Sequence, residues 1–171
     1  MSFADEYDTD EWGSKGSGCQ LSNDNKTITS IVGGSTGTRT GKGKLVMESG
    51  TGTYRYQIKI DQCHTGPDWI NWCCFGVCKP ESRGTYNSSD GTWFFNCFTD
   101  SGRGKCCNGT QSKYGTGATT GDTIAIVVNM DNKTVSFEKN GKDLGVAHTN
   151  IADRVVLCVD FWYSKQSISI L

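Results

Sequence analysis

The chain has 171 residues, which is enough to bury one hydrophobic core and too few for two, so we expect a single folded domain. Its 17 basic and 18 acidic residues give a net charge of −1 and form no basic block or face, so neither a nucleic-acid nor a membrane partner is predicted. No apolar run approaches the roughly 20 residues of a membrane span. The 22 glycines, against two prolines, favour tight turns between strands.

Residues 1–17 are predicted to form an acidic N-terminal arm. Five carboxylates lie within its first eleven residues, and few side chains in it could be buried. The favoured interpretation is a solvated, partly disordered arm. In the alternative, Trp12 packs against the folded domain and holds the arm to it. The folded domain is expected to span residues 18–171.

The start of the chain is acidic, whereas a secretory signal peptide is basic and then apolar. We therefore expect a cytoplasmic protein. Nine cysteines and four Asn-x-Ser/Thr sequons are instead typical of secreted proteins, so secretion stays as the alternative.

Alternation of apolar and polar residues predicts short strands from residue 19 onward. The first half of the chain is expected to hold a hairpin over 19–31 and strands over 44–48, 54–61, 69–78 and 92–98, with a short strand at Cys106 and Cys107. Between them, the glycine-rich run 33–43 and the polar run 81–91 are predicted to be loops.

The stretch Gly121 to Ala147 predicts three consecutive antiparallel strands. Its first strand alternates strictly, and Asn140–Gly141 is the strongest two-residue hairpin signal, typical of a type I′ turn. The third strand is expected to point Leu144 and Val146 inward. Two further strands, over 155–160 and 167–171, complete an all-β fold, a two-sheet antiparallel β-sandwich with no long helix.

The sequence of this hairpin identifies a family. A strand opened by Gly-Asp and followed by DNKTVSFEKNGKDLGVA, residues 131–147, resembles the C-terminal half of SPRY domains. The opening CQLSNDNKTIT resembles the PRY segment that often precedes SPRY. The corresponding strand of SPRY domains usually contains a Trp-Glu pair. The strand YRYQIKI, residues 54–60, lacks that pair. The resemblance extends over about residues 19–171 and implies a concanavalin-like jelly roll of the SPRY type.

Neither the cysteines nor the histidines form a pattern typical of a reactive centre. Sequence neighbours on a strand point to opposite faces of the sheet. Neither Cys73–Cys74 nor Cys106–Cys107 can therefore coordinate one metal ion together. Most thiols are predicted to be buried as small hydrophobes, with a cross-strand disulfide or metal as the alternative. With only His64 and His148 and no third orienting group, we expect no enzyme, no cofactor and no metal.

The resemblance implies where binding takes place. SPRY domains bind through loops gathered at one end of the sandwich, and the matching loops here are 33–43, 81–91 and 161–166. Peptide-binding relatives present an arginine with a nearby threonine, a tyrosine and a tryptophan in these loops. The implied partner-binding residues of this chain are Thr36, Arg39, Tyr86, Trp162 and Tyr163. For Tyr86 and Trp162 the alternative is that they fold back onto the domain, and for Arg39 that it is a solvated charge.

The predicted function is therefore a non-catalytic protein-interaction module that binds a peptide segment or surface of a partner protein, as one part of a larger ligase or scaffold assembly. Tyrosine, tryptophan and arginine are common binding hot spots because they combine contact area with a polar group. The alternative is a carbohydrate-binding, lectin-like sandwich. In that case Asp68, Trp69, Asn71 and Trp162 would supply the sugar platform.

Overall fold

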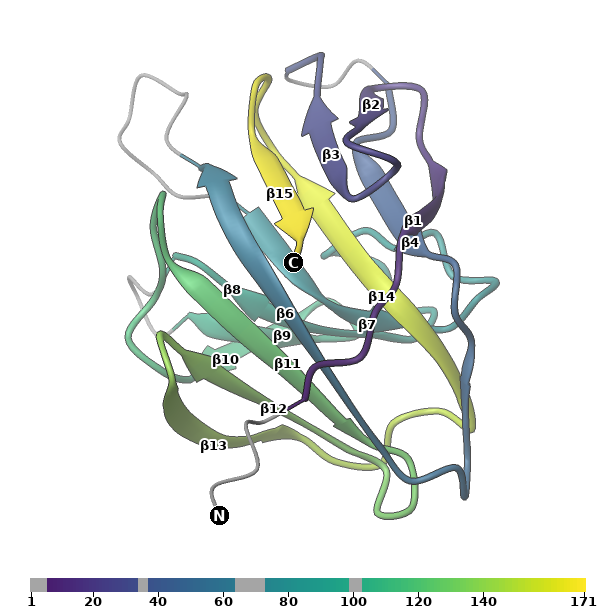
Figure 1. Cartoon of the computed structure of the whole chain (residues 1–171). Coiled ribbons are helices and arrows are strands. Elements are labelled where there is room, and N and C mark those ends of the chain that lie inside the picture. The colour runs from purple at the N-terminus through teal and green to yellow at the C-terminus, as the bar shows by residue number, and fades with distance from the viewer. Residues whose placement is uncertain (1–5, 34–36, 64–72, 99–102) are drawn as a thin grey trace.

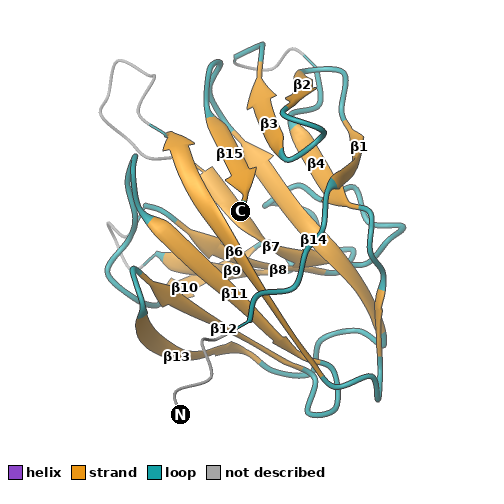
Figure 2. Ribbon diagram, viewed as in Figure 1, coloured by secondary structure: helices purple, strands orange, loops and turns teal. Residues whose placement is uncertain are grey.

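The computed structural model describes residues 6–33, 37–63, 73–98 and 103–171. Two antiparallel sheets pack face to face, and the described residues contain strands, turns and loops without a helix (Figures 1 and 2). The all-β, two-sheet antiparallel sandwich predicted from the sequence is confirmed. It follows that the described part of the chain holds no helix long and apolar enough to cross a membrane.

The first sheet has eight strands, in the order β1-β4-β14-β7-β8-β9-β10 with β5 paired to β14. They are β1 (Trp12–Lys15), β4 (Thr40–Gly43), β5 (Met47–Glu48), β7 (Cys73–Cys78), β8 (Thr92–Asn96), β9 (Gly104–Cys107), β10 (Thr110–Lys113) and β14 (Arg154–Phe161). Strands distant in sequence therefore lie side by side, as β14 does between β4 and β7.

The second sheet has seven strands, in the order β13-β12-β11-β6-β15-β3-β2. They are β2 (Cys19–Ser22), β3 (Thr27–Ser30), β6 (Thr53–Gln62), β11 (Thr123–Asn129), β12 (Thr134–Lys139), β13 (Lys142–His148) and β15 (Ser167–Ile170). The meander β11-β12-β13 is the hairpin series predicted for residues 121–147. Asn140 and Gly141 have φ of 49° and 82°, as a type I′ turn requires.

The main core fills the space between the sheets and includes a group of packed aromatic rings. The rings of Phe75 and Phe95 stack with centroids 5.3 Å apart, and Phe137 from the other sheet lies 5.4 Å from Phe95. All three side chains are fully buried. These rings join β7 and β8 of the first sheet to β12 of the second.

A second, smaller cluster lies on the outer face of the first sheet. Its buried members are Cys74, Cys78, Phe94, Cys106, Val156 and Cys158. Strands β7 and β8 are therefore buried on both faces, which is why their sequences are apolar throughout. Eight of the nine cysteines are buried and all nine are free thiols, so the prediction that most of them act as small hydrophobes is confirmed.

The N-terminal segment is part of the first sheet. Trp12 is 2% exposed, begins β1 and donates its Nε1–H to the carbonyl of Lys26 at 3.1 Å. The carboxylate of Asp10 accepts the backbone amides of Glu11, Lys44 and Leu45. The N-terminal segment was expected to be a solvated arm, but it contributes strand β1 to the first sheet. The alternative, in which Trp12 holds this segment against the sandwich, describes the structure.

The inward direction predicted for Val146 in β13 is wrong. Val146 is 57% exposed and Leu144 is half-buried, while Ala147 and His148 are buried. The pairing of β12 with β13 shifts register, and Gly145 adopts a φ of +83°. Such a bulge adds a residue to one strand and reverses the alternation beyond it.

Candidate functional site: the loop cluster around Trp162

The loop between β14 and β15, residues 162–166, is fixed by one buried glutamine. Gln166 Oε1 accepts the amides of Trp162 at 2.9 Å and Tyr163 at 2.8 Å, and its Nε2 donates to the carbonyl of Cys63 at 2.9 Å. Gln166 is fully buried, and its bond to the Cys63 carbonyl is buried while its bonds to the two loop amides are partly buried. The loop backbone is thereby held in place while the Trp162 side chain stays 42% exposed.

Three of the predicted binding residues contact one another. The rings of Tyr86 and Trp162 meet edge to face with centroids 6.2 Å apart, and the Arg39 guanidinium lies 5.7 Å from the Trp162 ring centroid. Arg39 Nε also donates to the carbonyl of Phe161 at 2.9 Å. Tyr86 is half-buried against the outer cluster of the first sheet, so it folds back in part and still borders the surface. We call the group of Arg39, Tyr86 and Trp162 the loop cluster.

Of the two remaining predicted binding residues, the structure describes Tyr163 and not Thr36. Tyr163 is half-buried and adjoins the loop cluster through its backbone bond to Gln166. Thr36 lies outside the described residues. The same holds for Asp68, Trp69 and Asn71 of the carbohydrate-binding alternative.

The loop between β7 and β8, residues 79–91, reaches the cluster by an unexpected route. It starts beside Val156, near the beginning of β14, and Gly84 then passes Cys158 before the Tyr86 amide meets Asp160, near the end of that strand. This loop therefore crosses the outer face of the first sheet and does not start at the end of the sandwich where the other two loops lie.

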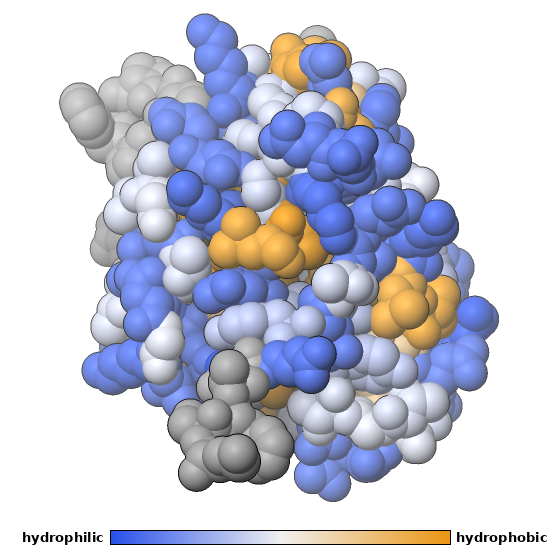
Figure 3. Space-filling model, in the orientation of Figure 1, coloured by the Kyte–Doolittle hydropathy of each residue, from blue (hydrophilic) through white to orange (hydrophobic). Residues whose placement is uncertain are grey.

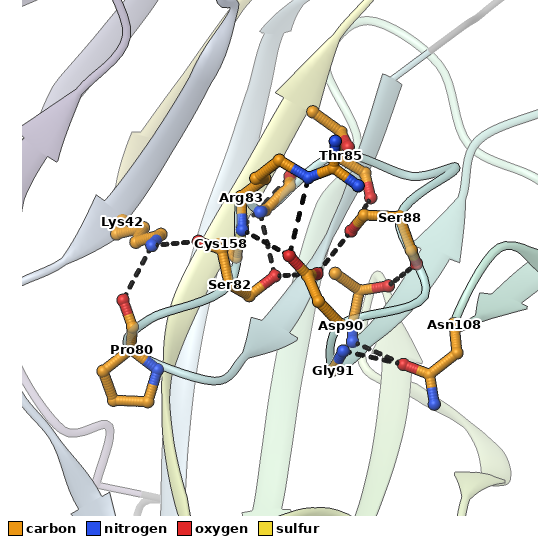
Figure 4. Close-up of polar contacts among 12 residues, drawn as sticks. Lys42, Pro80, Ser82, Arg83, Thr85, Ser88, Asp90, Gly91, Asn108 and Cys158 are labelled. Carbon is orange, nitrogen blue, oxygen red and sulfur yellow. Dashed lines mark hydrogen bonds and ion pairs between the residues drawn. The ribbon is translucent and has the colours of Figure 1, made fainter.

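Polar contacts inside this loop fix its shape (Figure 4). Asp90 accepts hydrogen bonds from the hydroxyls of Ser82 at 2.6 Å and Ser88 at 2.7 Å and from the amide of Arg83 at 2.9 Å. Partial burial by itself would raise the pKa of Asp90, but these hydrogen bonds hold it well below its usual range. Lys42 Nζ donates to the carbonyls of Pro80 and Ser82 and ties the loop to β4.

Thiols of the sheet below also support the loop. Cys106 Sγ donates to the carbonyl of Tyr86 at 3.0 Å, and Cys158 Sγ donates to the carbonyl of Gly84 at 3.5 Å. Burial raises the pKa of both thiols, that of Cys106 to about 11, so they remain protonated donors at neutral pH. A side chain at Gly84 would place its Cβ 2.9 Å from Cys158 Sγ, in a backbone conformation with φ of +71°.

Asp160 is the residue of this region that the sequence analysis missed. Its Oδ2 accepts the amide of Tyr86 at 2.9 Å. Burial raises the pKa of Asp160 to about 7, against the opposing effects of that hydrogen bond and of nearby Arg39. The available signal was a single acid that follows the apolar run VVLCV in this strand, because carboxylates in such strands are rare unless they have a partner.

We expect Asp160→Asn to stabilise the domain relative to the wild type at neutral pH and above. The folded-state pKa of Asp160 is raised from 3.8 to about 7, so its stabilising contribution is lost as pH rises through that window. Asparagine still accepts the Tyr86 amide and carries no charge. The variant should therefore gain on the order of 2–4 kcal/mol over the wild type between pH 4 and pH 8, measured by urea unfolding. Parallel pH curves for the two proteins would contradict this.

The described residues give no indication of a reactive centre. They contain no group of three or more His, Cys, Asp or Glu side chains arranged to hold a metal ion. His148 is buried with Nε2 3.0 Å from the carbonyl of Phe94, and burial lowers its pKa to about 4. His148 is thus a neutral packing residue, while His64 lies outside the described residues.

These features define a class: a jelly-roll β-sandwich whose surface loops are held rigidly by buried polar groups. The model of the SPRY domain family matches residues 53–171, well over half of the chain, and the chain belongs to that family. The resemblance noted in the sequence is thereby confirmed. SPRY domains are generally non-catalytic protein-interaction modules, and the carbohydrate-binding alternative is not favoured.

Solved structures agree with this assignment. The SPRY domain of human HERC1 superposes with a TM-score of 0.71 at 26% identity, covering 91% of this chain and 93% of that one. The PSpry domain of TRIM65 gives a TM-score of 0.71 over 96% of this chain and 90% of its own, at 10% identity, which speaks for the fold alone.

Similar curated proteins are far longer than this chain. Ran-binding protein 10 of Danio rerio is 46% identical over 52 residues, which are 30% of this chain and 9% of that protein. Human Ran-binding protein 9 is 44% identical over 52 residues, which are 30% of this chain and 7% of that protein. The matched segment is thus a small part of larger proteins.

Proposed function

We propose that this domain binds a short peptide segment or surface of a partner protein through the loop cluster of Arg39, Tyr86 and Trp162. The observation that carries the proposal is that Arg39 and Tyr86 both contact Trp162, so residues from three separate loops meet around a partly exposed tryptophan. Such a group combines apolar contact area with hydrogen-bonding and cationic groups, as binding hot spots do.

The rigidity of the loops favours this use. Gln166 fixes the loop that carries Trp162, and Asp90, Lys42 and Cys106 fix the loop that carries Tyr86. Because these backbones are already ordered, a partner that docks on them loses little loop entropy. This argues for a pre-formed surface that binds without large rearrangement.

The distribution of exposed apolar residues also supports a compact site. On the face in Figure 3, apolar residues form small, separated patches among polar ones. The large apolar side chains that are exposed in the described residues are Ile31, Leu45, Val146, Trp162 and Leu171. Of these, Trp162 is the one that also carries the aromatic and cationic contacts of the loop cluster.

The test is a pair of substitutions in the loop cluster. Peptides selected from a random display library on the immobilised wild-type domain should bind it in calorimetry, and Tyr86→Ala with Trp162→Ala should weaken that binding at least about a hundredfold. Val146→Ala is the matched control, because Val146 is exposed on β13 outside the loop cluster. An unchanged affinity of the double variant would overturn the proposal.

The unfolding midpoint is measured for every variant, so that loss of binding is separated from loss of folding. Trp162→Ala alone serves as the second variant, because this side chain is 42% exposed and the loss of its ring contact with Tyr86 should cost only about 0.5–1.5 kcal/mol, which leaves the domain folded. We further propose that the domain works as one module of a larger cytoplasmic assembly. Its nine free thiols suit a reducing compartment.

A further inference from the structure

A small crevice opens between the rings of the loop cluster. It is lined by Cys74, Tyr86, Asp160, Phe161 and Trp162, and its volume is about 10 Å³. That is room for a group the size of one water molecule. Whatever enters this crevice is therefore a single small group at the tip of a longer side chain, or water itself.

The polar group at the crevice is the carboxylate of Asp160. Its Oδ2 accepts the Tyr86 amide, and its Oδ1 accepts no hydrogen bond from any part of the chain that the structure describes. Asp160 is half-buried, and a donor that enters the crevice can take up this open acceptor oxygen. The crevice is thus chemically suited to a hydrogen-bond donor.

The groups around Asp160 leave its charge only partly balanced. The titratable groups that interact with it are Cys19 on β2, Cys74 on β7, Cys158 on β14, Tyr86 in the loop and Arg39 beside β4. Burial raises the pKa of the three thiols and of Tyr86, so they stay neutral. Arg39 is the one cation of this set, and its guanidinium lies over the Trp162 ring and bonds to the carbonyl of Phe161.

We propose that this crevice receives the ε-ammonium group of a lysine in the bound partner, with Asp160 Oδ1 as its acceptor. An ammonium group is about the size of a water molecule, carries the complementary charge and is attracted to aromatic faces such as those of Tyr86 and Trp162. A guanidinium is a larger planar fork, and a carboxamide brings an acceptor oxygen toward the carboxylate. This inference rests on the proposed function of the loop cluster and makes Asp160 a specificity-determining residue.

The experiment starts from the peptides that a random display library yields on the wild-type domain. We expect a lysine to recur at one position among them. Replacing that lysine with norleucine, which keeps the length and removes the charge, should weaken binding to the wild type about tenfold or more. On Asp160→Asn, which keeps an acceptor for the Tyr86 amide, the same replacement should change the affinity less than about twofold.

The pH dependence gives an independent readout. Affinity for the lysine peptide should rise between pH 6 and pH 8 on the wild type, as Asp160 loses its proton, and should stay flat for the norleucine peptide and for Asp160→Asn. Melting curves recorded alongside show whether each variant is folded at both pH values.

The possible outcomes separate the two proposals. Selected peptides without a recurrent lysine, or an equal loss on wild type and Asp160→Asn, would show that the crevice holds only water and would overturn the lysine assignment. If the double variant of Tyr86 and Trp162 also loses binding, the proposed function stands without that assignment. If the double variant binds as the wild type does, the loop cluster is not the binding site and both proposals fail.

Discussion

Phe95→Ala is expected to destabilise the domain by about 3–5 kcal/mol. Phe95 is fully buried in β8 and contacts Phe75 at 5.3 Å, Phe137 at 5.4 Å and Tyr114 at 6.2 Å between ring centroids. Its removal leaves a cavity at the point where the two sheets meet, and rings held from both sheets cannot collapse freely into it. Urea unfolding followed by tryptophan fluorescence measures the loss.

A graded series makes this prediction specific. Phe95→Leu keeps much of the volume and should cost clearly less than alanine, while Val146→Ala on the exposed face of β13 should change stability by less than about 0.5 kcal/mol. A loss below about 1 kcal/mol for Phe95→Ala would mean that the aromatic group is not central to the core.

Trp12→Ala should have an effect of the same order, about 3–5 kcal/mol. The side chain is 2% exposed, belongs to the main core and donates a hydrogen bond to Lys26. Its loss removes buried apolar area and one of the two hydrogen bonds that the Lys26 carbonyl accepts, the other coming from the amide of Ile170 at 2.8 Å. Because Trp12 begins β1, which pairs with β4, the change should also loosen the N-terminal segment, measured as faster amide exchange at residues 12–15.

Trp12→Phe is the matched control. Phenylalanine keeps most of the apolar area and loses the Nε1–H donor, so the expected cost is nearer 1–2 kcal/mol. If alanine and phenylalanine cost the same, the hydrogen bond to Lys26 and not the packing would hold the segment. A stability equal to that of the wild type for both would show that β1 contributes nothing to the fold.

The loop cluster illustrates how a rigid sandwich can present a small binding surface. Apart from Asp160 near the end of β14, the sheets contribute by fixing the ends of the loops that carry the proposed site. Tyr86 depends on this support most strongly, since its amide is bonded to Asp160 and its carbonyl to Cys106. Substitutions beneath the loop are therefore expected to act on binding through the position of Tyr86.

Local sequence patterns predicted most of the strands, the turns and the family, but they placed β1 in a solvated arm and β4 in a glycine-rich loop. Alternation with period two and turn residues such as Asn140–Gly141 are local properties, because they depend on the backbone preferences of a few adjacent residues. For the same reason Arg39, Tyr86 and Trp162 could be singled out only by their resemblance to a family and by their residue types. Nothing local indicated that these three side chains touch.

Contacts between segments that are distant in sequence follow from the tertiary fold. Trp12 is buried because β1 pairs with β4, and Val146 is exposed because a bulge shifts β13 against β12. Asp160 is 74 residues from Tyr86, and the two meet because the loop after β7 crosses back over β14. Pairing between distant strands is fixed by the packing of the whole core, so a local pattern cannot encode it, and the acceptor at the centre of the proposed site becomes visible only in the folded domain.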